Sequence, residues 1–181
     1  MFTFLNSFIH KSQAFDSIVF FLAVQLPYIV IAAAGLFLLL YKTAHDNVVW
    51  IKGLPRRIAK CVHVGFAVGI AYGITAILKR VIHHARPFEG KDGITPLFQH
   101  SGGDSFPSGH ATAFAAIATI IYFHNKTAGI FFWIAAILIS VSRVVAGVHY
   151  PIDIAAGICI GAGVGVIMNK VWRKIAKATT Y

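Results

Sequence analysis

The chain has 181 residues, of which 57% are hydrophobic and 12% are charged, and its mean hydropathy is +0.74. Soluble domains carry about 25% charged residues, so this composition excludes an ordinary soluble domain and favours a protein embedded in a bilayer. The length predicts one domain, residues 1–181, with its core motifs at 79–153. The formal net charge is +10, but the basic residues are scattered between apolar runs and form no continuous face, which argues against a nucleic-acid partner.

Apolar runs follow one another along the chain, and a spanning helix needs about 20 mostly apolar residues. The runs cover residues 17–41, 58–83, 108–123, 127–145 and 151–171, of which the third is short for a full crossing. Residues 1–15 are too short for another span and include polar side chains, so we expect an amphipathic segment on the membrane surface. The sequence therefore predicts an all-α integral membrane helix bundle of about five transmembrane helices plus an N-terminal interfacial segment.

Features within these runs predict how the helices pack. Pro27 should kink the first helix, while neighbouring helices satisfy the backbone group that it frees. The tight loop 124–126 predicts that the third and fourth helices form an antiparallel hairpin. Glycine recurs at every fourth residue on one face of two helices, at Gly65, Gly69 and Gly73 and at Gly157, Gly161 and Gly165. Because glycine lets helix backbones approach closely, we expect both faces to lie in contacts within the bundle, with homodimerisation through one of them as the alternative.

The distribution of Lys and Arg predicts the orientation, because basic loops stay on the cytoplasmic side of a membrane. The side that holds the motifs described next carries Lys11, Lys79, Arg80, Arg86, Lys91 and Arg143. The opposite side carries Lys42, Lys52, Arg56, Arg57, Lys60, Lys126, Lys170, Arg173, Lys174 and Lys177. We therefore expect the motifs and the N-terminus outside and the C-terminus in the cytoplasm.

Three short motifs place cationic and hydrogen-bonding side chains at the ends of apolar runs. They are Lys79-x6-Arg86-Pro87, Pro107-Ser108-Gly109-His110 and Ser142-Arg143-x5-His149-x3-Asp153. Because successive spanning helices alternate in direction, the second helix ends, the third begins, the fourth ends and the fifth begins on one side of the membrane. The motifs are thus expected to share one site, and charged residues at the membrane boundary indicate a functional one.

The cations and the helix start in these motifs suit a phosphate. An Arg guanidinium binds phosphate oxygens in a bidentate manner and a Lys adds a point charge, so Arg86, Arg143 and Lys79 could neutralise a phosphoryl group. Snorkelling to lipid headgroups is the alternative interpretation of these side chains. Ser108 and Gly109 stand at a helix start, where main-chain N–H groups attract an anion, unless Ser108 is a plain N-cap.

The histidines could supply the chemistry. Asp153 follows His149 by four residues, about one helical turn, so its carboxylate can reach the imidazole, fix its tautomer and support positive charge. A purely structural hydrogen bond between them is the alternative. His110, beside the anion site, could act as an acid. No pair of histidines has a metal-ligand spacing with a supporting carboxylate, so no metal site is expected.

These three motifs, in this order, resemble those of the type 2 phosphatidic acid phosphatase superfamily, which includes lipid phosphatases, bacterial acid phosphatases and vanadium haloperoxidases. The resemblance covers roughly residues 60–170. It implies that His149 is a nucleophile that forms a phosphohistidine, that Asp153 orients it and that His110 protonates the leaving oxygen. It assigns phosphate binding to Lys79, Arg86, Ser108, Gly109 and Arg143. It implies a metal-independent phosphatase without a cofactor.

The short layout is similar to that of the bacterial undecaprenyl-diphosphate phosphatases of the bacitracin-resistance type, whereas many family members have more spans. That similarity implies a multi-pass protein of the bacterial inner membrane, with its site on the periplasmic or extracellular side, that converts undecaprenyl diphosphate to undecaprenyl phosphate. Phosphatidylglycerophosphate, phosphatidic acid and lipid A 1-phosphate are alternative substrates, and phosphoryl transfer to another lipid is a variant. A non-enzymatic transporter of anions or lipids is the competing class. The expected partner is a membrane lipid, and the protein could act as a monomer.

Overall fold

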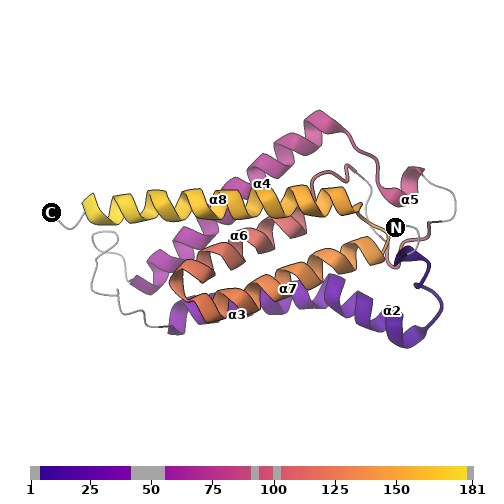
Figure 1. The fold of residues 1–181 in the computed structure, drawn as a ribbon, viewed down its shortest axis with the longest axis horizontal. Coiled ribbons are helices and arrows are strands. Elements are labelled where there is room, and N and C mark those ends of the chain that lie inside the picture. Colours follow the sequence, from indigo (N-terminus) through magenta and orange to yellow (C-terminus); the bar gives the residue numbers. More distant parts are fainter. Residues whose placement is uncertain (1–4, 42–55, 91–93, 100–102, 179–181) are drawn as a thin grey trace.

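The computed structural model describes residues 5–41, 56–90, 94–99 and 103–178, and all regular structure in these ranges is helical (Figure 1). In chain order the elements are α2 (Gln13–Phe20), the π-helical turn η1 (Phe21–Gln25), α3 (Leu26–Leu40), α4 (Arg56–Ile82), the short α5 (Pro87–Gly90), α6 (Gly109–His124), α7 (Lys126–Val145) and α8 (Pro151–Ala178). Lys42, Lys52 and Lys91, which contribute to the expected orientation, lie outside the described residues.

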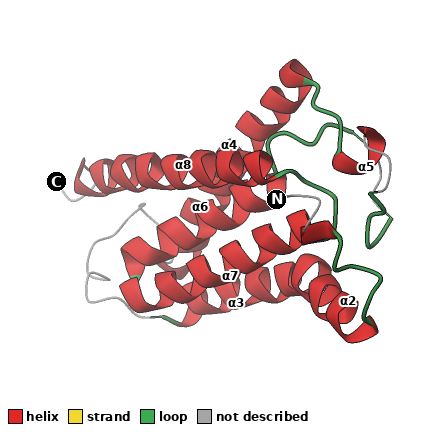
Figure 2. Cartoon of the chain, turned by 45° about the vertical axis from the view of Figure 1, so that its right-hand side comes forward, coloured by secondary structure: helices red, strands yellow, loops and turns green. Residues whose placement is uncertain are grey.

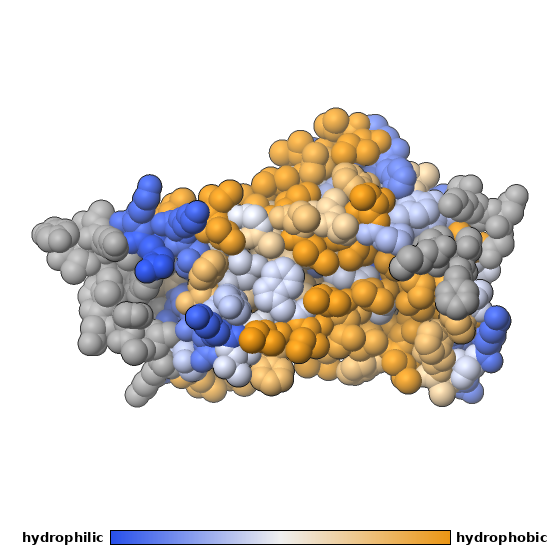
Figure 3. Space-filling model, viewed as in Figure 1, coloured by the Kyte–Doolittle hydropathy of each residue, from blue (hydrophilic) through white to orange (hydrophobic). Residues whose placement is uncertain are grey.

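Most of the bundle consists of helices that could cross a bilayer. The described segments long and apolar enough to do so are Gln13–Leu40, Arg57–Glu89, Lys126–Val145 and Pro151–Ile175. The remaining long helix, α6, has 16 residues and is shorter than these. Figure 3 shows apolar residues over the middle of the bundle and hydrophilic ones toward its two ends. The all-α membrane bundle is therefore confirmed, with a short helix inside it.

The N-terminal segment is packed against the end of the bundle. The first helix begins at Gln13, a few residues before the apolar run, because the Ser12 side chain accepts a main-chain N–H and caps it. In the preceding turn, Asn6 is 7% exposed and its Nδ2 donates to the Val145 carbonyl at 3.3 Å. The described N-terminal residues are thus joined to the end of α7 by a partly buried hydrogen bond, and their placement at the membrane surface stays a prediction.

The first long helix bends between α2 and α3 (Figure 2), and Pro27 lies in the first turn of α3, just after η1. Proline has no N–H to donate to the carbonyl four residues earlier, that of Ala23, and the wider turn of η1 accommodates its ring. The neighbouring helix supplies a donor, because the Arg143 Nη1 lies 3.3 Å from the Ala23 oxygen. The expected kink, and its satisfaction by a neighbouring helix, are both confirmed.

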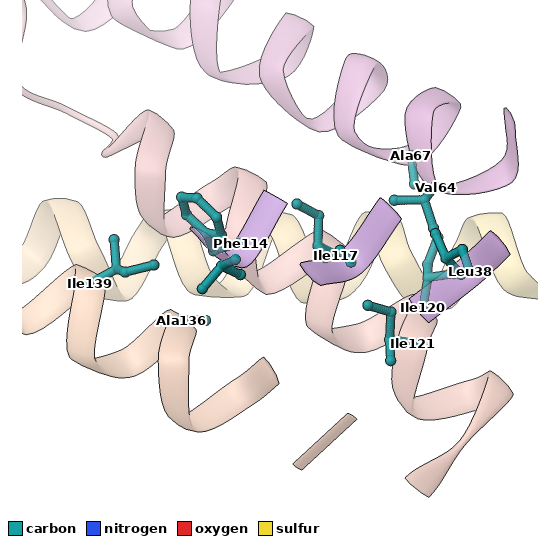
Figure 4. Close-up of a cluster of buried hydrophobic side chains, with 11 residues drawn as sticks. Leu38, Val64, Ala67, Phe114, Ile117, Ile120, Ile121, Ala136 and Ile139 are labelled. Atoms are coloured by element: carbon teal, nitrogen blue, oxygen red, sulfur yellow. The ribbon is translucent and has the colours of Figure 1, made fainter. Parts of the chain in front are cut away.

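The central helix is α6, which contacts α4, α7 and α8. It is apolar on all sides, which is typical of a helix in the interior. Its side chains Phe114, Ile117, Ile120 and Ile121 form the main core with residues of α3, α4 and α7 (Figure 4). Asn125 then ends α6 and caps α7, because its side-chain oxygen accepts a main-chain N–H at 2.8 Å. The antiparallel hairpin of α6 and α7 is confirmed.

The glycine face of α8 is confirmed as a close contact with α6. A Cβ added to Gly161 would lie 2.1 Å from the Thr112 carbonyl oxygen, and one added to Gly157 would lie 2.7 Å from the Ser108 carbonyl oxygen. Real Cβ atoms do not approach a carbonyl oxygen this closely, so only glycine fits. The two helices therefore pack backbone to backbone, and this brings the starts of α6 and α8 together.

The corresponding prediction for α4 is wrong. No described atom lies within 4 Å of a Cβ added to Gly65, Gly69 or Gly73, and the first two line an open groove of about 490 Å³ on the surface of the described bundle. The helix packs instead through a neighbouring face, where Ala67 and Ala71 are 0% exposed. Alanine is small enough for a close helix contact, so α4 has two small-residue faces and the sequence pattern pointed to the other one.

Candidate active site

Helix ends and loops from all three motifs meet at one end of the bundle, opposite the end of α8 (Figures 1 and 2). The ends of α4 and α7, the starts of α6 and α8 and the loops beside them contribute. They carry every residue assigned from the sequence: Lys79, Arg86, Ser108, Gly109, His110, Arg143, His149 and Asp153. The alternation of helix directions therefore brings the motifs to the same end of the molecule, as expected.

His149 and Asp153 form a buried pair at the start of α8, with 3% and 0% of their surfaces exposed. The His149 Nδ1 lies 3.3 Å from the Asp153 Oδ2, and the Tyr150 N–H donates to the same oxygen at 2.8 Å. Pro151 opens α8, so the carboxylate lies in its first turn, where unpaired N–H groups favour a negative charge. A carboxylate beside Nδ1 favours the tautomer with its hydrogen on Nδ1, which leaves a lone pair on Nε2.

A further buried side chain, that of Ser105, joins this pair, although none of the three sequence motifs includes it. Its hydroxyl donates to the Asp153 Oδ2 and lies 3.2 Å from the His149 Nδ1, and the residue is 0% exposed. Its one signal in the sequence is its place in the loop shortly before Pro107. On the other side of the carboxylate, the His84 Nδ1 lies 3.7 Å from the Asp153 Oδ1.

Arg86 and Arg143 are 5% and 4% exposed, which excludes snorkelling to headgroups for these two side chains. The Arg86 Nη1 donates to the Val148 carbonyl at 2.8 Å, and its Nε donates to the Gly103 carbonyl at 3.0 Å. Arg143 has the bond to η1 described above, while its Nε has no hydrogen-bond partner among the described residues. A buried guanidinium with an unused donor is suited to bind an anion.

Lys79 and Ser108 come from α4 and from the start of α6. The half-buried Lys79 donates through Nζ to carbonyls of the loop ahead of α6, among them that of Ser105 at 3.3 Å. Ser108 is 0% exposed, donates its N–H to the Asp153 carbonyl at 3.0 Å, and has no hydroxyl partner among the described residues. Its side chain does not cap α6, so the plain N-cap interpretation is wrong. The hydroxyl and the main-chain N–H groups of the helix start suit an anion.

Gly109 and His110 form the first turn of α6. A Cβ added to Gly109 would lie 3.3 Å from the Tyr72 ring, so a larger residue would press the helix start against α4. The half-buried His110 ring stacks on that of Phe114, with centroids 6.3 Å apart, which orients it from within the helix. Together with three cations and the His149–Asp153 pair, this helix start can hold a tetrahedral anion and offer it a nucleophilic nitrogen and an acid.

Known proteins share this fold and sequence pattern. Bacitracin transport permease protein BcrC of Bacillus licheniformis is 27% identical over 160 residues, which cover 88% of this chain and 73% of that protein. Undecaprenyl-diphosphatase BcrC of Bacillus subtilis is 25% identical over 158 residues, which cover 87% of this chain and 75% of that protein. The crystal structure of Aquifex aeolicus LpxE has the same fold, with a TM-score of 0.74, 24% identity and coverage of 93% of this chain and 92% of that one. The family model of the PAP2 superfamily matches residues 60–177, so the chain belongs to the PAP2 superfamily.

Proposed function

We propose that this chain is a membrane-embedded lipid phosphatase that removes a phosphate from a lipid monophosphate or diphosphate through a phosphohistidine at His149. The observation that carries the proposal is the buried His149–Asp153 pair, which shares one end of the bundle with the buried Arg86 and Arg143. An imidazole held by a carboxylate beside cations suits attack on a phosphoryl group. Membership of the PAP2 superfamily supports the same reaction class.

In the first half-reaction, the Nε2 lone pair of His149 forms a P–N bond to the terminal phosphorus while the P–O bond to the leaving oxygen breaks. That oxygen is the lipid oxygen of a monophosphate or the bridging oxygen of a diphosphate. His110 gives its proton to the leaving oxygen. In the second half-reaction, water attacks phosphorus, the P–N bond breaks and its electron pair returns to Nε2, while His110 takes a proton from the water. Inorganic phosphate leaves, and both histidines are restored to their starting states.

The remaining residues act on charge and geometry. Lys79, Arg86 and Arg143 would neutralise the phosphoryl oxygens, whose charge grows in the transition state. The Ser108 hydroxyl and the N–H of Gly109 would complete the phosphate site. The cycle needs neither a metal nor a cofactor, because side-chain cations and helix N–H groups supply the electrostatic stabilisation.

The pH dependence of the reaction follows from the burial of His149. Burial lowers the pKa of His149 from 6.5 to about 4, the hydrogen bond with Asp153 opposes this shift, and Arg86 and Arg143 add to it. Its ring is therefore neutral at pH 5, where an ordinary histidine is mostly protonated. We expect kcat/KM, corrected for substrate ionisation, to have its acidic limb near pH 4 and an alkaline limb where the general acid loses its proton. An acidic limb centred at pH 6.5 would contradict a buried nucleophile.

Undecaprenyl diphosphate, converted to undecaprenyl phosphate, is the substrate that we propose. Similarity over most of both chains to the Bacillus subtilis undecaprenyl-diphosphatase supports it, as does the shared short layout. Phosphatidylglycerophosphate, phosphatidic acid and lipid A 1-phosphate are the alternatives. Because the Bacillus licheniformis relative is named a transport permease, transport of an anion or lipid is the competing function.

We place the protein in the bacterial inner membrane, with its site on the periplasmic or extracellular side, its C-terminus in the cytoplasm and a monomer as the working unit. The site and the C-terminal end of α8 lie at opposite ends of the bundle, which supports opposite sides of the membrane (Figure 1). The basic residues Lys170, Arg173 and Lys174 lie toward that C-terminal end, as a cytoplasmic end requires.

The test is phosphate release by the purified protein in detergent with a chelator present. The four lipids are compared side by side, with His149→Ala as the control. We expect chelator-resistant release that is fastest from undecaprenyl diphosphate and absent in the variant. Preference for another lipid would keep the reaction and replace the substrate. Absence of His149-dependent release from all four would refute the phosphatase and favour transport.

A further inference from the structure

The Asp153 Oδ2 is surrounded by donors, one of which the reaction described above does not use. It accepts from the Ser105 hydroxyl, accepts from the Tyr150 N–H at 2.8 Å, and lies 3.3 Å from the His149 Nδ1. The Ser105 Oγ is itself 3.2 Å from the same Nδ1. Ser105, His149 and Asp153 thus form a closed triangle of polar atoms with no more than 3% of any residue exposed.

The donor and acceptor capacities within this triangle assign a role to each atom. A serine hydroxyl has one hydrogen and two lone pairs. When its hydrogen points to the Asp153 carboxylate, a lone pair of the Ser105 Oγ faces the His149 Nδ1. The Nδ1–H of His149 then has two acceptors, the Ser105 Oγ and the Asp153 Oδ2, and rotation of the imidazole ring would break both contacts. Buried polar groups of this kind lock geometry because water cannot replace a lost partner.

We propose that Ser105 is a positioning residue: its hydroxyl ties the Asp153 carboxylate to the His149 Nδ1–H, so that Nε2 points to the bound phosphate. This inference rests on the proposed function, in which His149 is the nucleophile. Ser105 acts on the nitrogen that does not attack, so its side chain contributes to the chemical step and not to phosphate binding.

The main chain of Ser105 has separate contacts that a substitution preserves. Its N–H donates to the His84 carbonyl at 2.6 Å, and its carbonyl accepts from the Lys79 Nζ at 3.3 Å. Both atoms remain in Ser105→Ala, which removes the hydroxyl alone. A fall in kcat without a change in phosphate affinity would therefore result from loss of the Ser105 hydroxyl alone.

The experiment uses Ser105→Ala and Ser105→Cys in the full chain, purified in detergent. We expect kcat and the rate of phosphoenzyme formation, measured by rapid quench with a labelled lipid phosphate, to fall about tenfold or more in both. The inhibition constant of inorganic phosphate should stay within about threefold of its original value. Cysteine is somewhat larger than serine and is a much weaker donor, so it fills the position and provides a second test if the alanine variant does not fold.

The matched control is Ser140→Ala, which removes a hydroxyl that is 1% exposed and has no partner among the described residues. It should leave kcat unchanged. A loss below about threefold in the folded Ser105 variants, or a rise in the phosphate inhibition constant parallel to the fall in kcat, would overturn the inference. His149→Ala is assayed alongside: release by that variant would remove the proposed function itself, whereas an inactive His149→Ala beside active Ser105 variants would remove only the role of Ser105.

Discussion

Replacing His149 by alanine is expected to lower kcat for phosphate release by about 10⁴-fold or more, because only binding and charge stabilisation remain without the covalent nucleophile. Phosphate affinity should change little. Arg86 is held by the carbonyls of Val148 and Gly103, so its position does not depend on the imidazole ring. The measurements are phosphate release under saturating lipid and competitive inhibition by inorganic phosphate.

Two further variants separate the nucleophile from its surroundings. His149→Gln keeps an amide near Asp153 and should be as inactive as the alanine variant, since it cannot form a phosphohistidine. His83→Ala removes a side chain that is 73% exposed at the end of α4 and should retain full turnover. Substantial turnover by both His149 variants would mean that another group accepts the phosphoryl group or that water attacks directly.

Replacing Gly161 by alanine is expected to lower the free energy of unfolding by about 2–4 kcal/mol. The added Cβ would lie 2.1 Å from the Thr112 carbonyl oxygen, a backbone atom of α6 that cannot turn aside as a flexible side chain can. The helices must therefore separate. Separation would also strain the bond from the Ser108 N–H to the Asp153 carbonyl, which is 3.0 Å long, so activity should fall with stability. Thermal unfolding in detergent and phosphate release measure the two effects.

Gly163→Ala is the matched control, because Gly163 lies on the same helix, is exposed and has no described atom within 4 Å of an added Cβ. This substitution should leave the unfolding temperature unchanged or raise it slightly, since alanine favours a helix over glycine by about 1 kcal/mol. Equal stability of the two alanine variants would show that α6 and α8 are not in backbone contact.

The site could be predicted from the sequence wherever its geometry is local or follows from chain direction. Four residues separate His149 from Asp153, and one helical turn places their side chains together whatever surrounds them. The alternating directions of the spanning helices predicted that the three motifs lie at one end of the bundle, and no side-chain contact was needed for that prediction. The kink at Pro27 was predictable for the same reason, because a proline always lacks the N–H that the helix needs.

Other features depend on which distant parts of the chain pack around a residue, and these became visible only in the tertiary structure. Both α4 and α8 carry glycine every fourth residue, yet only the face of α8 meets α6, because Ala67 and Ala71 give α4 a second small face. No sequence feature distinguishes Ser105 from other loop serines, and only the fold brings its hydroxyl to the Asp153 carboxylate. The burial of Arg143, and the carbonyl that it finds at the Pro27 kink, likewise require two helices far apart in sequence to be side by side. The helices, their ends and the spacing within a turn follow from local sequence, whereas burial and the partners of each polar group depend on packing between helices.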